Sequence, residues 1–230
     1  MNISNPLGTD VNSYFLLDAV SDPFIIGVEN YDVQAEILPS HFSDKSDYDN
    51  LIRLLGSNYF WENSRTIKDC ELKVDALELK QGARLLDFLR FSPGLINTKF
   101  AVSNPVRELI SSFQCTHTFF LDSILLANGD KFSYSLLYIE SLDRKFLNYS
   151  KTVFAIGDRV MGFEVQKLDS EETELECSKQ YYDLTVLEVS LDDSFEFKPD
   201  IFSLYGKIFI SRSLAFSFVE QSFTGMELKK

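Results

Sequence analysis

The sequence has few of the residue types on which metal and nucleophilic chemistry most often depend. Among its 230 residues there are three cysteines and two histidines. Cys70, Cys115 and Cys177 are odd in number and contain no C-x-x-C pair, so we expect neither a structural zinc site nor a disulfide framework. We expect reduced, partly buried thiols, as in a cytoplasmic protein. No glycine cluster follows a predicted strand, so no nucleotide cofactor is expected.

The same scarcity argues against catalysis. His117 lies two residues from Cys115, and side chains at that spacing share one face of a strand. A nucleophilic pair also needs an orienting third group and oxyanion donors, and no motif signals them. His41 lies in a polar segment, and the G-x-S-x-G pattern of serine hydrolases is absent. The sequence therefore predicts no catalytic residue and a protein that is not an enzyme.

Long apolar runs are missing too. No run approaches the roughly 20 residues that span a bilayer, and the first six residues lack a basic region followed by an apolar core. The sequence therefore predicts no membrane partner, no secretory signal and a cytoplasmic location.

Basic residues are outnumbered, with 22 Lys and Arg against 35 Asp and Glu and a net charge of -13. Such a protein repels nucleic acid and anionic membranes, because affinity for phosphate comes mostly from Lys and Arg. An acidic surface instead favours fast capture of a basic protein. Residues 169–200 hold eleven acidic residues and two lysines, a net of -9. We therefore predict that this segment docks a positively charged protein partner.

The docking role is predicted for eight acidic side chains within this segment: Glu171, Glu172, Glu174, Glu176, Asp192, Asp193, Glu196 and Asp200. A simpler interpretation is a solvated loop at 170–176, followed by a hairpin whose edge is protected by charges. No Asp-x-Asp-x-Asp-Gly loop is present, so no bound metal is expected.

Apolar and aromatic residues are abundant. They make up 45% of the chain, with 21 Phe and 10 Tyr, a composition that favours strands around a well-filled core. The pattern predicts an α+β, strand-rich fold of antiparallel sheets with two or three short helices. An N-terminal β-rich region at 1–82 and an α+β region at 83–230 are expected to form one compact unit.

The N-terminal region gives mostly extended signals. Residues 1–12 are predicted to be a loose tail, and 39–50 a polar loop. Residues 83–91 suggest a short strand or one helical turn before the Pro93–Gly94 break. The remaining predicted strands cover residues 14–17, 24–28, 35–38, 58–61 and 71–79.

A clearer pattern begins at residue 99. A strand at 99–102 ends at Ser103, which with Asn104 offers a helix cap before Pro105. The apolar residues of 106–113 are spaced for one helix face. Two strands follow, at 118–126 and 131–140, joined by a turn at 128–130.

The end of the sequence repeats this pattern. Residues 209–211 match 101–103, an apolar helix face follows at 214–219, and Gly225 precedes a final strand. Ser103 and Ser211, which end the two matching segments, are 108 residues apart. This spacing suggests a duplicated strand–helix–strand unit and is too long for a solenoid repeat.

These segments carry a resemblance to a known family. The run F-A-V-S at 100–103, the strand Y-S-L-L-Y-I-E-S-L-D at 134–143 and the ending I-F-S-L-Y-G-K-I-F-I-S at 201–211, with F-T-G-M-E-L at 223–228, resemble the bacterial immunity protein 11 family. The resemblance covers residues 83–230. The acidic insert after Lys167 departs from the family pattern.

The resemblance implies a protein without enzymatic activity. Members of this family are encoded beside polymorphic or contact-dependent toxins and protect the producing cell. By analogy, the protein would bind a cognate toxin domain and occlude its active site. An acidic protein fits a basic toxin, such as a nuclease, and no catalytic residue is carried over. Two alternatives remain open: a carboxylate-based hydrolase of unrecognised type, and an adaptor or structural protein of a secretion system.

Overall fold

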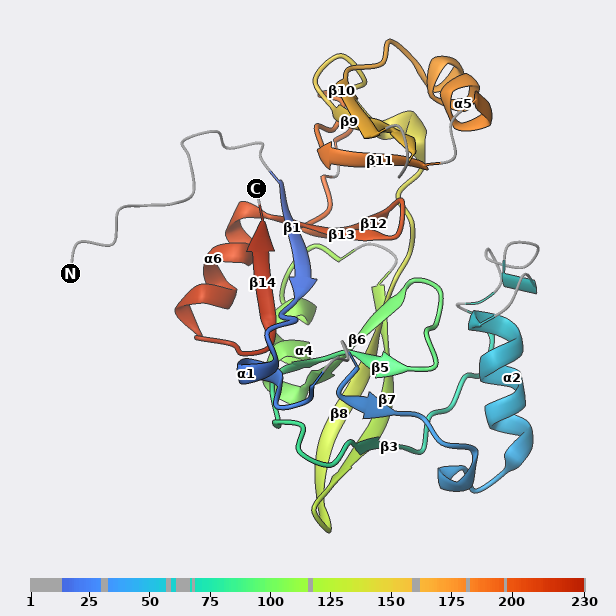
Figure 1. Ribbon diagram of the computed structural model, residues 1–230, viewed down its shortest axis with the longest axis vertical. Helices are drawn as coiled ribbons and strands as arrows, with labels where there is room; N and C mark the ends of the chain where they lie inside the picture. Colours follow the sequence, from blue (N-terminus) through green and yellow to red (C-terminus); the bar gives the residue numbers. More distant parts are fainter. Residues whose placement is uncertain are drawn as a thin grey trace, which may run out of the picture.

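The structure is a computed structural model with an α+β, strand-rich fold (Figure 1). It describes residues 14–29, 33–56, 59–60, 67, 69–115, 118–158, 162–180, 183–196 and 198–229. The predicted tail at 1–12 and His117 lie outside these residues, as do both ends of the strand predicted at 58–61. The three sheets described below confirm the predicted fold class.

A four-stranded antiparallel sheet has the order β12–β13–β1–β14. Its strands are β1 (Tyr14–Ala19), β12 (Ile201–Leu204), β13 (Lys207–Ser211) and β14 (Met226–Lys229). The first and last described strands of the chain are therefore neighbours.

A seven-stranded sheet has the order β4–β6–β8–β7–β3–β2–β5. Its strands are β2 (Ala35–Glu36), β3 (Ala76–Leu79), β4 (Phe88–Leu89), β5 (Phe91–Ser92), β6 (Thr98–Ser103), β7 (Thr118–Ala127) and β8 (Asp130–Ile139). This sheet is mixed rather than antiparallel, because β3 pairs with β7 and β2 with β5 in parallel. The predicted turn between β7 and β8 is confirmed: Asn128 and Gly129 both have positive φ, 52° and 90°, as a type I′ hairpin requires.

The third sheet is small and antiparallel, with the order β10–β9–β11. Its strands are β9 (Val153–Asp158), β10 (Gly162–Gln166) and β11 (Asp183–Glu188). Together with α5 (Glu171–Gln180) it forms the upper end of the molecule in Figure 1.

The helices exceed the predicted two or three. Within the described residues there are four α-helices besides α5: α1 (Pro23–Ile26), α2 (Lys45–Leu55), α4 (Asn104–Ser111) and α6 (Arg212–Glu220). Short 3-10 turns occur at η1 (Pro39–His41) and η3 (Arg144–Phe146).

The repeated unit predicted from the sequence has a clear structural counterpart. In the first copy β6, α4 and β7 follow one another, and β8 lies between the two strands. In the second copy β13, α6 and β14 do the same, with β1 between the strands. The outer strands β4 and β12 also correspond, so the orders β4–β6–β8–β7 and β12–β13–β1–β14 match. The β8 position of the second copy is filled by β1, which comes from the other end of the sequence.

Two aspartates link the copies crosswise. Asp87 accepts hydrogen bonds from Ser103 Oγ (2.8 Å), at the start of α4, and from Thr224 N (2.9 Å), after α6. Asp200 accepts from Ser211 Oγ (2.5 Å), at the start of α6, and from Gln114 N (3.0 Å), after α4. Each aspartate therefore ties the beginning of one helix to the end of the other.

Three hydrophobic clusters hold the layers together. The middle cluster joins β6 and β8 to β1 and β13 through α4 and α6, with Phe88 and Phe218 in edge-to-face contact at 5.4 Å. The other face of the large sheet packs on α2, and the other face of the four-stranded sheet packs on the small sheet. Because the N-terminal strands β1, β2 and β3 belong to the two larger sheets, no sheet boundary falls at residue 82.

Two local predictions were wrong. Residues 24–28 form helix α1 rather than a strand, because Asp22 caps it, Pro23 fits its first turn and Gly27 ends it at φ 80°. The polar loop predicted at 39–50 contains η1 and most of α2, whose cap is Asp44. In α2, the apolar residues Leu51, Leu54 and Leu55 are buried, a helical spacing hidden by the polar residues before them.

Candidate docking surface

The acidic helix α5 carries four of the predicted docking residues. It begins after Ser170, whose Oγ accepts a hydrogen bond from Thr173 N (3.3 Å), and acidic side chains in the first turn suit the helix dipole. A hydrogen bond with Ser170 lowers the pKa of Glu172. Glu172 and Glu176 are exposed, and Glu171 is half-buried. These three carboxylates lie on the surface, as a docking role requires.

Glu174 has a different environment, because it is 0% exposed. Tyr149 Oη donates to its Oε2 at 2.8 Å, and Arg144 Nη1 lies 2.8 Å from its Oε1. Burial, and then this carboxylate, raise the pKa of Tyr149 and of Tyr205. The structure therefore places Glu174 in an internal polar network that holds α5 against the loop after β8, where a partner does not reach it.

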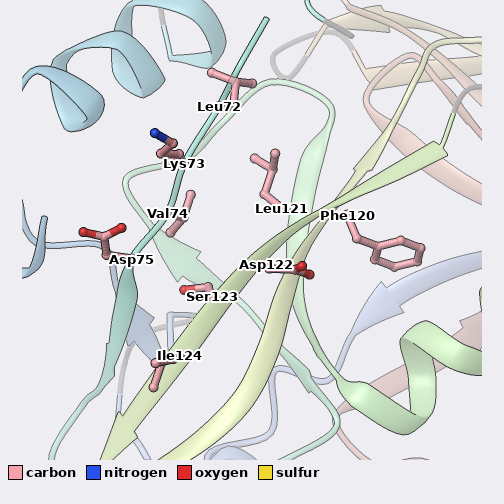
Figure 2. Close-up of a pocket in the computed structure, with 9 residues that line it drawn as sticks. All are labelled: Leu72, Lys73, Val74, Asp75, Phe120, Leu121, Asp122, Ser123 and Ile124. Atoms are coloured by element: carbon pink, nitrogen blue, oxygen red, sulfur yellow. The ribbon is translucent and has the colours of Figure 1, made fainter. Parts of the chain in front are cut away.

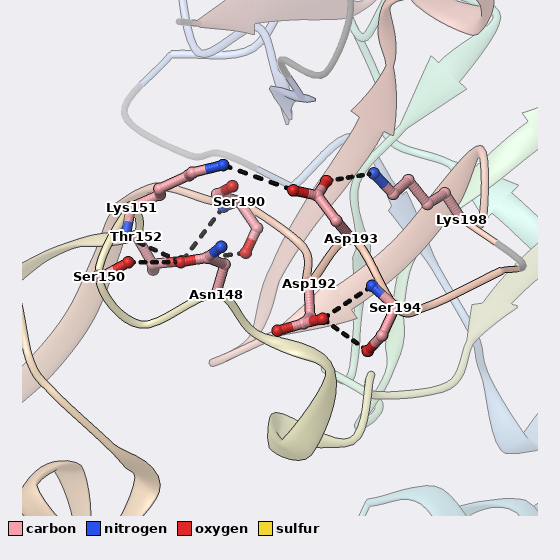
Figure 3. Close-up of polar contacts among 9 residues, drawn as sticks. All are labelled: Asn148, Ser150, Lys151, Thr152, Ser190, Asp192, Asp193, Ser194 and Lys198. Atoms are coloured by element: carbon pink, nitrogen blue, oxygen red, sulfur yellow. Dashed lines mark hydrogen bonds and ion pairs between the residues drawn. The ribbon is translucent and has the colours of Figure 1, made fainter.

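The loop at 192–196 carries three more of the predicted residues, and Figure 3 shows two of them, Asp192 and Asp193. Asp192 Oδ1 accepts from Ser194 N (2.8 Å) and Ser194 Oγ (2.6 Å), and these bonds lower the pKa of Asp192. Asp193 lies 3.3 Å from Lys198 Nζ and 3.6 Å from Lys151 Nζ. The charge of Asp193 is therefore balanced locally, whereas Glu196 is exposed with no ion pair to another described residue.

Neighbouring hydrogen bonds hold this loop in place. Asn148 Oδ1 accepts from Ser150 Oγ (2.8 Å) and from Lys151 N (3.2 Å), and Thr152 Oγ1 donates to Ser190 O at 3.1 Å (Figure 3). The segment that presents Asp192 and Asp193 is thereby anchored on the turn that precedes β9.

The structure does not bring the eight predicted residues together on one surface. Asp200 is the aspartate that links α4 and α6, and Glu174 is internal. The remaining surface carboxylates lie on α5 and on the 192–196 loop. Among them only Asp193 has an ion pair in the described chain, and Asp192 is hydrogen-bonded to Ser194. Sequence reasoning missed the roles of Arg144, Tyr149 and Asp87. For Asp87 a signal was available, because an aspartate directly precedes an apolar strand in both repeats, Asp87 before β4 and Asp200 before β12.

An open groove lies between the segment 72–75 and β7 (Figure 2). Its volume is about 500 Å³, and it lies where the chain diverges from β7 before β3 begins. Its two carboxylates are both engaged: Asp75 accepts from Ser43 N (2.6 Å), and Asp122 pairs with Arg107. The bond from Ser43 lowers the pKa of Asp75, the opposite of what a general acid needs.

The environment of Cys115 also differs from that of a nucleophile. Its thiol donates to Ile110 O at 3.1 Å, and burial raises its pKa to about 12, whereas a reactive thiol needs a lowered pKa. No group of three or more His, Cys, Asp or Glu suited to a metal ion occurs within the described residues. No described helix is both long and apolar enough to cross a bilayer.

Comparison with known proteins adds no assignment. No family model matches the chain, and no curated protein is significantly similar to it. The resemblance to the immunity protein 11 family therefore stays a prediction.

Proposed function

We propose that this protein is a bacterial immunity protein, which binds a basic toxin domain in the cytoplasm and occludes its active site. The observation that carries the proposal is the surface of α5 and the 192–196 loop, where Glu171, Glu172, Glu176 and Glu196 have no ion pair within the described chain. Unbalanced surface carboxylates in a chain of net charge -13 raise the encounter rate with a basic partner.

Two features of the packing support a binding role. Ion pairs, hydrogen bonds and buried side chains hold the acidic elements in place, through Glu174 for α5 and through the bond from Thr152 to Ser190 for the loop. A surface that is ordered before binding loses less conformational entropy in the complex. The three cysteines are free thiols, as expected in the cytoplasm.

The direct test uses the gene next to this one. Co-expression with the C-terminal domain of the neighbouring protein is expected to rescue cells from that domain, and the two purified proteins are expected to form a one-to-one complex. A neighbouring domain that is toxic and neither bound nor neutralised would overturn the proposal.

The electrostatic part has its own test. Replacing Glu171, Glu172, Glu176 and Glu196 by lysine is expected to slow association by about tenfold or more at low salt, since steering raises association rates well above the neutral range. The wild-type rate is expected to fall as salt rises, and the variant rate to fall less or to rise. Reversing Asp130 and Glu220, which are exposed outside this surface, is the matched control.

A further inference from the structure

The edge strand β10 is unusually open. It pairs with β9 on one side, and no described strand covers its other side. All five of its residues are exposed, and two are large and apolar: Phe163 is 48% exposed and Val165 is 65% exposed. Open edges of this kind are templates for another strand, and natural proteins usually protect them.

The other outer strands near this end of the molecule show such protection. At β11, Lys207 Nζ donates to Val186 O at 2.8 Å, and α5 packs alongside. At β12, the backbone of residues 140–142 covers the edge, since Ser203 N donates to Glu140 O at 3.2 Å and Leu142 N donates to Ser203 O at 2.8 Å. By contrast β10 has the sequence G-F-E-V-Q, with no proline and no lysine. Of these three outer strands, β10 is the one whose edge has neither a covering side chain nor a covering backbone segment in the described structure.

The register defines what a strand added to β10 would meet. Phe163 and Val165 lie opposite Gly157 and Ala155 of β9, so they share one face of the small sheet. Glu164 points to the opposite face. An added strand would therefore contact two apolar side chains on one face and a carboxylate on the other.

The charge around this edge selects the kind of partner. Residues 157–188 contain nine acidic and three basic residues, a net of -6. A second copy of this chain would bring its own Glu164 and its net charge of -13 to the same place, and opposed like charges destabilise a strand pair. A basic strand from a different protein has the complementary charge.

We infer that β10 receives an extended strand of the basic partner by β-sheet addition. The added strand places apolar side chains beside Phe163 and Val165 and a lysine or arginine beside Glu164. Acidic residues on α5 flank the same end of the molecule (Figure 1). This inference rests on the proposed function and specifies the surface through which that function is carried out.

The experiment uses the full chain and the domain encoded by the neighbouring gene. Val165→Lys is expected to raise the Kd about tenfold or more, the loss typical of an interface hot spot. Val219→Lys is the matched control, because Val219 is also an exposed valine (56%) but lies on α6. Circular dichroism and the melting temperature verify that both variants fold.

Hydrogen exchange gives a second readout, since a paired strand protects backbone amides. Slower exchange within residues 162–166 in the wild-type complex is expected. A complex that forms normally with Val165→Lys, or that protects only the groove of Figure 2, would refute strand addition at β10 and leave the immunity function standing. Failure of the wild-type chain to bind the domain at all would overturn both.

Discussion

The carboxylate of Glu174 shows how a residue can belong to an acidic segment and yet serve packing. We expect Glu174→Gln to lower the free energy of unfolding by about 1.5–3 kcal/mol, because hydrogen bonds to a charged group contribute on that scale and Arg144 would lose its partner. Urea denaturation measures the change. Glu176→Gln on the exposed side of the same helix is expected to stay within about 0.5 kcal/mol, and equal losses in the two variants would contradict the assignment.

Cys115 gives a prediction about reactivity. Its pKa of about 12 leaves roughly one thiol in ten thousand ionised at pH 8, against roughly a quarter for a free cysteine. Since the thiolate is the nucleophile, we expect alkylation by iodoacetamide to be roughly a thousandfold slower than for the same cysteine in the urea-unfolded chain. Mass spectrometry of the labelled peptide measures both rates, and fast labelling of the native protein would show that the thiol is activated.

For single residues, the sequence showed where acidic side chains are concentrated but did not show what each of them does. The concentration of acids at 169–200 was visible, but Glu174, Asp192 and Asp200 look like their neighbours in the sequence. Their roles depend on Tyr149, Ser194 and Gln114, and two of these contacts join residues far apart in the chain. A buried carboxylate is identified by the partner that satisfies it, and that partner is known only once the chain is folded.

At the scale of the elements, we expect Asp87 and Asp200, which link helices α4 and α6, to be important for stability. Asp87→Ala and Asp200→Ala are each expected to destabilise the protein by about 1.5–3 kcal/mol, because each removes the acceptor that joins one helix start to the other helix end. Thermal and urea unfolding measure the losses. Glu220→Ala, on the exposed end of α6, is the control, and a loss in only one of the aspartate variants would contradict their equivalence.

The success of sequence reasoning differed between elements for physical reasons. The units built on Ser103 and Ser211 were predictable, since cap, helical spacing and hairpin turn all agree within one short segment. Helix α2 was missed because the polar residues of its first two turns hide the buried Leu51 and Leu55. The position of β1 between β13 and β14 was beyond local reasoning, because it joins opposite ends of the chain.

For the whole molecule, two electrostatic effects act on folding stability: long-range repulsion among the excess carboxylates lowers it, and local ion pairs raise it. With a charge of -13, the folded chain is under self-repulsion that the more expanded unfolded chain relieves. Ion pairs such as that between Asp18 Oδ1 and Arg90 Nη2, which are 2.6 Å apart, stabilise the folded state instead. Such part-exposed pairs contribute little individually, so we expect repulsion to dominate.

Salt separates these two effects. Raising the ionic strength from about 0.01 M to about 1 M shortens the Debye length from about 30 Å to about 3 Å, and we expect the free energy of unfolding in urea to increase. Changing Glu176 and Glu196 to glutamine brings the net charge from -13 to -11. This variant should be more stable than the wild type at low salt and gain less as salt is added. A wild-type stability that falls with salt would show that the local ion pairs outweigh the repulsion, and the acidic surface would then be a balanced part of the fold rather than charge held for a partner.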